Sequence, residues 1–130
     1  MSSGTDISSQ DLFIPLCAPE ISGNEWKYVK ECLDTGWVSS AGPFVERFEE
    51  ETARYVGAKR GVAVSNGTTA LHVALKVLGV EPDDEVIVSN LTFVAAANAV
   101  SYCGAHPILM DADPSTWQID VEKVARFLDE

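Results

Sequence analysis

The sequence has few of the residues that would build a cross-linked or metal-stabilised fold. Its three cysteines, Cys17, Cys32 and Cys103, are odd in number and contain no Cys-x-x-Cys pair. We therefore expect neither a disulfide framework nor a zinc site, and this cysteine usage fits a reducing cytoplasm. No His or Cys stands near the paired carboxylates Asp111 and Asp113, so we expect turn and capping roles for them and no metal site.

Positive charge is also scarce. The 130 residues contain 9 Lys and Arg against 20 Asp and Glu, which gives a net charge of −11. Nucleic-acid-binding domains usually carry basic patches, so this balance argues against a nucleic-acid partner. It does not exclude a local anion site, because helix N-termini bind phosphate through backbone groups.

Long apolar runs are absent as well. No run approaches the roughly 20 residues of a membrane span, so we expect no membrane association. The polar N-terminus lacks a signal-peptide hydrophobic region, and we predict a flexible tail over residues 1–12.

Hydrophobic residues nevertheless make up 46% of the sequence, enough for a packed core. Ser22 and Glu25 have capping-box spacing and predict a helix that ends at Gly36. A second helix is predicted from about Phe44 to Tyr55.

From residue 62 onward, short apolar runs alternate with helical patterns. We predict strands at 62–64, 86–88 and 107–110, and helices at 70–78, at 93–102 and, capped by Asp120, at 121–128. The helix at 70–78 is apolar nearly all round, so we expect it to be buried. This alternation is typical of βαβ units and predicts an α/β domain with a mainly parallel sheet. The last helix has no obvious closing strand after it, which indicates a truncated domain.

The turn between the first strand and its helix gives the sharpest signal of a binding site. Here Ser65, Asn66, Gly67, Thr68 and Thr69 follow an apolar run, and a helix begins. Such a turn directs free backbone N–H groups and the positive end of the helix dipole at one point, where a phosphate would bind. The sequence contains neither GxxxxGK[ST] nor GxGxxG, so it is neither a Walker A loop nor a dinucleotide fingerprint. The alternative is a polar turn that only caps the helix.

Other candidate residues lie outside this turn. Phe93 follows the second strand, where a planar side chain could cover an aromatic cofactor, although a core position is the alternative. Ser39 lies in the loop 37–43, which could contact a substrate or simply connect two helices. His72 is expected to be a packed histidine. The five lysines stand in no apolar context suited to Schiff-base chemistry: Lys27, Lys30, Lys59, Lys76 and Lys123.

Together these segments resemble the DegT/DnrJ/EryC1/StrS family of pyridoxal-phosphate (PLP) sugar aminotransferases. The matching blocks stand in the family's order and spacing: GWVSSAGPFVERFEE, VAVSNGTTALHVAL, DDEVIVSNLTFVAAANAVSYCGAHPILMDAD and the Asp120 helix. The resemblance implies that residues 13–130 are the N-terminal part of a fold type I PLP-transferase large domain. The opening IPLCAPEISGNEWKYVKECLDTGWVSSAG is most similar to aminotransferases of UDP-4-keto-6-deoxy-N-acetylhexosamines, as in legionaminic-acid or bacillosamine-type pathways.

The resemblance also implies roles for individual residues. Gly67, Thr68 and Thr69 match the turn that holds the PLP phosphate, and Phe93 matches the aromatic residue that stacks on the pyridine ring. Ser39 matches a loop that approaches the sugar or the neighbouring subunit. Family enzymes are homodimers with active sites at the subunit interface, and their usual amino donor is glutamate.

The chain departs from the family pattern in three places. Thr69 stands where Ala or Ser is common, and Asn90 replaces a small residue for a reason that the sequence does not give. The Schiff-base lysine and the carboxylate that faces the pyridine nitrogen are expected beyond Glu130, so no catalytic residue is assigned in this chain and it should be inactive alone. Three alternatives stay open: a PLP-dependent sugar dehydratase of the same family, a non-catalytic phosphate- or nucleotide-binding α/β module, and a truncated chain that merely dimerises.

Overall fold

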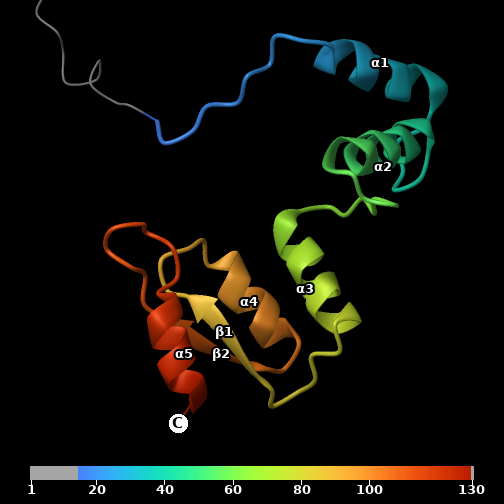
Figure 1. The fold of residues 1–130 in the computed structure, drawn as a ribbon. Coiled ribbons are helices and arrows are strands. Elements are labelled where there is room, and N and C mark those ends of the chain that lie inside the picture. The colour runs from blue at the N-terminus through green and yellow to red at the C-terminus, as the bar shows by residue number, and fades with distance from the viewer. Residues whose placement is uncertain (1–14, 130) are drawn as a thin grey trace, which may run out of the picture. The chain divides into compact units, whose positions relative to one another are not determined.

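A computed structural model describes residues 15–129 (Figure 1). The predicted tail at 1–12 lies outside the described residues. The chain forms two compact units, one up to Arg47 and one from Phe48 onward, and each is described by itself. The helices and strands are α1 (Glu25–Thr35), α2 (Pro43–Val56), α3 (Gly67–Val77), β1 (Glu85–Ser89), α4 (Ala95–Tyr102), β2 (His106–Met110) and α5 (Val121–Asp129).

In the first unit, α1 starts differently from the prediction and ends as predicted. The residue that caps its N-terminus is Asn24, not Ser22, so the predicted capping box is wrong. The Glu25 carboxylate turns back and accepts a hydrogen bond from the Gly23 backbone N–H at 2.9 Å. It is thus bonded to a residue that precedes the helix. At the other end, Gly36 adopts a left-handed φ of 75°, which ends the helix as glycine usually does.

The second unit is built around a parallel pair of strands (Figure 1). β1 and β2 pair in parallel, with Glu85 opposite His106 and Ser89 opposite Met110. α4 connects the two strands and packs against both of them and against α3. This arrangement confirms the predicted alternation of strand, helix and parallel strand.

The hydrophobic core lies between this strand pair and α4. Val100 is only 2% exposed and packs with Val88, Cys103 and Ala105. Partly buried side chains of α3, β1, α4 and the turn before β1 surround this cluster: Leu75, Val80, Val86 and Ala96. Burial of a valine side chain contributes about 1.5–3 kcal/mol, so this small cluster holds α4 on the strands.

Two predictions for the segment before the strand pair are wrong. Residues 62–64 form no strand within the described chain, and Val62 is 80% exposed. The Ala63 N–H donates to the Glu49 carboxylate at 2.7 Å, whereas in a strand it would donate to a neighbouring carbonyl. α3 contains no buried residue, because among the described elements it packs mainly on α4. An apolar run favours a strand or a buried helix but does not supply the partner that either needs.

Two glycines with left-handed backbones allow a test of how tightly the core turn is packed. Gly104 has φ 80° and a Cβ placed on it would lie 3.3 Å from Pro82 Cβ, whereas Gly79 has φ 89° and open space. A left-handed alanine costs about 1–2 kcal/mol. Gly79→Ala should therefore lower the free energy of unfolding by about this amount, and Gly104→Ala by more because Pro82 must also move. Urea denaturation measures both, and equal losses would show that the contact with Pro82 costs nothing.

Candidate functional site

The turn before α3 is held by Asn66. This residue is the N-cap of the helix, with an extended backbone, and its side-chain oxygen accepts a hydrogen bond from the Thr69 N–H at 2.9 Å. The Thr69 hydroxyl donates to the same oxygen at 3.1 Å, and the Asn66 carbonyl accepts from the Ala70 N–H at 3.1 Å. Both donors of Thr69 are thus used inside the turn, so this residue braces the cap in the present structure.

The backbone N–H groups of Gly67 and Thr68 remain available. Within the described residues neither donates a hydrogen bond, because both precede the first intrahelical bond of α3. They stand at the positive end of the helix dipole, which favours an anion. A Cβ placed on Gly67 would meet nothing within 4 Å, so the approach to its N–H is open.

Phe93 lies beside these two donors. A hollow of about 570 Å³, here called the Phe93 hollow, is lined by Asn66, Gly67, Thr68, Ala70, Leu71, Phe93 and Ala95. Phe93 is 82% exposed, so it does not occupy a core position. Its ring lines the hollow and faces solvent. The structure therefore brings together three of the cofactor-binding candidates, Gly67, Thr68 and Phe93, on one mostly apolar surface with two free N–H donors.

His72 lies one helical turn further along α3, on another side of the turn. It is half-buried, and its ring meets the ring of Tyr102 edge to face with centroids 5.8 Å apart. Together with Asn66, Thr68 and Thr69 this pair lines a second hollow of about 400 Å³. The contact with Tyr102 agrees with the predicted packing role of His72.

Ser39 belongs to the first unit, in the exposed loop between α1 and α2. In that loop Gly42 lies against Trp37, since a Cβ placed on Gly42 would meet the indole ring at 3.1 Å. Ser39 is therefore described within the first unit alone.

A polar cluster that the sequence did not predict lies where β1 and β2 end; it is called here the Asn90 clamp and consists of Asn90, Asp111 and Lys123. The Asn90 side-chain amide donates to one oxygen of Asp111 at 2.8 Å, and the Lys123 ammonium donates to the other at 2.8 Å. The hydrogen bond from Lys123, its charge and the bond from Asn90 hold the pKa of Asp111 below its usual range. The hydrogen bond to Asp111 raises the pKa of Lys123. The sequence marked Asn90 as unusual and expected a turn or capping role for Asp111; that expectation is wrong, because the Asp111 carboxylate bonds to Asn90 and Lys123.

The other acidic residues of this region have the predicted turn and capping roles. Asp113 accepts hydrogen bonds from the hydroxyl and N–H of Ser115 and from the N–H of Thr116, and these bonds lower its pKa. Asp120 accepts from the Lys123 N–H at 3.0 Å and so caps α5. Between residues 15 and 129 no three His, Cys, Asp or Glu side chains come together to hold a metal ion. In the same range no helix is long and apolar enough to cross a membrane.

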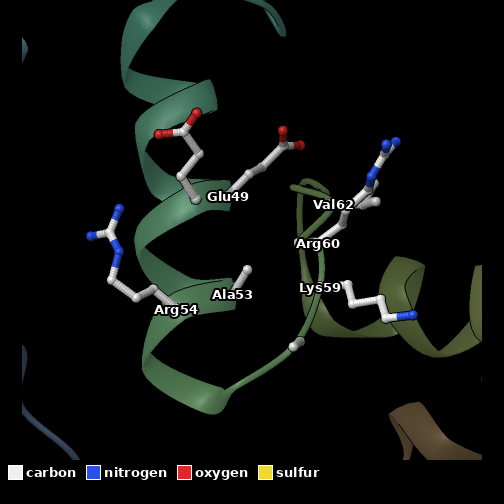
Figure 2. Close-up of a pocket in the computed structure, with 9 residues that line it drawn as sticks. Glu49, Ala53, Arg54, Lys59, Arg60 and Val62 are labelled. Carbon is white, nitrogen blue, oxygen red and sulfur yellow. The ribbon is translucent and has the colours of Figure 1, made fainter.

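A further hollow of about 590 Å³ lies between α2 and the segment at 58–62 (Figure 2). Arg54, Lys59 and Arg60 line it, but their side chains point in different directions and do not converge on one point. The backbone of the segment approaches α2 closely, since a Cβ placed on Gly61 would lie 2.7 Å from the Glu49 carbonyl oxygen. These contacts describe packing of the segment on α2 and give no focused anion site.

The Asn90 clamp predicts a specific pH dependence. A carboxylate with a lowered pKa stabilises the fold above its ordinary pKa, and this contribution is lost as the pH falls through the lowered value. A lysine with a raised pKa stabilises below its ordinary pKa, and its contribution is lost as the pH rises through the raised value. Lys123→Met removes the hydrogen bond and the charge that lower the pKa of Asp111. That pKa should then rise toward its usual range, as followed by carboxyl-carbon NMR. Asp113 is the internal control, because its hydrogen bonds do not involve Lys123; a pKa of Asp111 that does not change would contradict the ion pair.

Comparison with known proteins places this geometry in context. The chain is 52% identical over 115 residues to the GDP-perosamine synthase of Caulobacter vibrioides, covering 88% of this chain and 31% of that protein. It is 45% identical over 113 residues to the GDP-perosamine synthase of Vibrio cholerae, covering 87% and 31%. The chain thus spans about 31% of the length of these curated relatives. Their names refer to a GDP-linked sugar, whereas the opening segment resembled enzymes of UDP-linked sugars.

Solved structures show the same fold. A Streptococcus pneumoniae protein described as a sugar aminotransferase, in its PLP form, superimposes with a TM-score of 0.80 at 31% identity, over 87% of this chain and 29% of that one. NtdA of Bacillus subtilis with bound cofactor PMP gives 0.72 at 37% identity, over 78% and 23%. The predicted α/β fold of a fold type I PLP transferase is thereby confirmed. Residues 19–130 match the family directly, and the chain belongs to the DegT/DnrJ/EryC1/StrS aminotransferase family.

Proposed function

We propose that residues 13–130 form the N-terminal part of the large domain of a PLP-dependent enzyme, which moves an amino group from glutamate to a 4-keto-6-deoxy nucleotide sugar. The observation that carries the proposal is the Phe93 hollow, in which Gly67 and Thr68 offer two free N–H donors beside an exposed aromatic ring. These groups fit a ligand with a phosphate at one end and a planar ring at the other.

Each residue of the hollow has a separate task in this proposal. The N–H groups of Gly67 and Thr68 bind the phosphate, and Thr69 braces the turn through its two bonds to Asn66. The ring of Phe93 covers one face of the pyridine ring and excludes water from it. The bound cofactor supplies an electron sink for the amino transfer. Because the donors belong to the backbone, this site needs no basic side chain in a chain of net charge −11.

Within the second unit, no lysine is placed to move a proton at this site. Lys76 donates to the Val80 carbonyl at 3.2 Å, Lys123 is bound to Asp111, and no lysine lines the Phe93 hollow. We therefore place the Schiff-base lysine and the carboxylate that faces the pyridine nitrogen beyond Glu130, and we expect the 130 residues alone to be inactive. The whole enzyme is proposed to be a cytoplasmic homodimer, with Ser39 near the sugar or the partner subunit.

The nucleotide of the substrate has two candidates. The relatives in Caulobacter vibrioides and Vibrio cholerae support a GDP-linked 4-keto-6-deoxyhexose, and identity to the first is 52%. The opening segment 14–42 resembles enzymes that aminate UDP-linked N-acetyl sugars. The support for the GDP-linked sugar rests on identity over 115 residues, so this sugar is the first substrate to test.

The first prediction from the proposed function concerns the complete reading frame that encodes the chain, expressed with PLP. A visible absorption band should appear, and borohydride should abolish it and label a lysine beyond Glu130. Glutamate should bleach the band and the GDP-linked keto-sugar should restore it. Tight PLP binding without a lysine-linked band would favour the dehydratase, and no PLP binding would overturn the proposal. Glutamate-dependent amination by the 130-residue chain itself would contradict its expected inactivity.

The second prediction tests the backbone donor at Gly67. Gly67→Pro removes one N–H but keeps α3, because proline suits the first helical position and Asn66 already has the extended backbone that precedes proline. A hydrogen bond to a charged group contributes about 1.5–3 kcal/mol, so PLP should bind roughly tenfold to a hundredfold more weakly.

Gly67→Ala is the matched control for this change, since it keeps the N–H and its Cβ meets nothing within 4 Å. Spectral titration of the complete protein with PLP should give an affinity near the wild-type value for Gly67→Ala. Wild-type affinity in Gly67→Pro would show that the Gly67 N–H does not bind the phosphate.

A further inference from the structure

The Asn90 clamp lies at the point where β1 turns toward Phe93. The Asn90 N–H donates to the Met110 carbonyl at 2.9 Å, and its side-chain amide donates to Asp111 at 2.8 Å. Two hydrogen bonds thus attach this single residue to the end of β2. Only Leu91 and Thr92 separate it from Phe93.

Asp111 is itself fixed from two further directions. Its second carboxylate oxygen accepts from the Lys123 ammonium at 2.8 Å, and its carbonyl accepts from the Asp120 N–H at 2.9 Å. Both partners belong to α5 or its cap, so the oxygen that receives Asn90 is held by β2 and α5 together. Asn90 therefore binds to a carboxylate that α5 also holds.

The ring of Phe93 lacks such support from packing. The side chain is 82% exposed, so neighbouring side chains do not set its position. Its backbone is held on the following side, where the Phe93 carbonyl accepts from the Ala96 N–H at 3.2 Å in the first turn of α4. On the preceding side the Leu91 N–H donates to the Ser89 hydroxyl of β1 at 3.3 Å, and the nearest bonds to β2 and to Asp111 beyond it are the pair made by Asn90.

We propose that Asn90 is a positioning residue that, through Asp111 and Lys123, fixes the backbone from which Phe93 covers the cofactor ring. This inference rests on the proposed function for the ring's partner, but the ordering of Phe93 by the clamp does not require a cofactor. It also gives the asparagine at this position a physical reason: a small side chain would not reach the Asp111 carboxylate, and aspartate would repel it.

The test separates the ring of the cofactor from its phosphate. In the complete protein, Asn90→Ala should weaken PLP binding about threefold to tenfold, the range of one aromatic stacking contact. Competition by inorganic phosphate should be unchanged, because Gly67 and Thr68 are not attached to the clamp. The visible circular dichroism per bound PLP should fall, since the ring is held less firmly.

Two comparisons distinguish positioning from a general loss of structure. In a Phe93→Ala background, Asn90→Ala should cause no additional loss of PLP affinity, because the residue acts through that ring. Asp113→Asn is the matched control, as it removes a neighbouring carboxylate of the same loop that does not contact Asn90. Additive losses in the double variant, or equal weakening of phosphate and PLP, would overturn the proposal.

A readout without cofactor keeps the two proposals distinguishable. The amide hydrogen of Ala96 should exchange faster in Asn90→Ala than in Asp113→Asn. The NMR order parameter of the Phe93 backbone should also be lower in Asn90→Ala. If the wild-type protein binds no PLP, the proposed function fails while this difference still supports the clamp. If PLP binds but Phe93 is equally ordered in both variants, the clamp fails and the proposed function stands.

Discussion

The parallel pairing of β1 with β2 is the constraint on which the rest of the site depends. Parallel strands end at the same edge of a sheet, so the residues that follow them meet there although they are far apart in sequence. In this way the side-chain amide of Asn90, after β1, comes within 2.8 Å of a carboxylate oxygen of Asp111, after β2. The connection between the strands must return along the sheet, and α4 does so with its own Val100 side chain buried. Phe93 precedes that helix, so its place follows from the same connection.

The chain combines a strong negative charge with a site that would hold an anion. These properties are compatible because the donors are peptide groups at a helix terminus, whose partial charges do not depend on the net charge of the chain. The acidic residues near the strand ends also have local partners: Asp111 pairs with the charge of Lys123 and accepts from Asn90, and Asp113 accepts the hydrogen bonds of its own turn. The described acidic groups nearest the strand ends are thus held by partners of their own.

Local signals in the sequence predicted those features that depend on neighbouring residues. Gly36 ends α1, Asp120 caps α5, and the two apolar runs before and after α4 pair as strands. Features that depend on distant partners were predicted poorly. Residues 62–64 were predicted to form a strand but pair with no strand in the described chain. α3 was predicted to be buried but is largely exposed. Asn90 lies 21 residues from its acceptor, which no periodicity or spacing rule connects.

The Asn66 turn also bears on how such a protein can change over evolutionary time. Its two free N–H donors are main-chain groups, which every amino acid except proline carries, so most single-residue changes at Gly67 or Thr68 leave the donors in place. The vulnerable position is Asn66, whose side chain alone holds the cap. In the proposed function, residues around the hollow can therefore diversify while the phosphate donors persist, which makes the turn a source of mutational robustness.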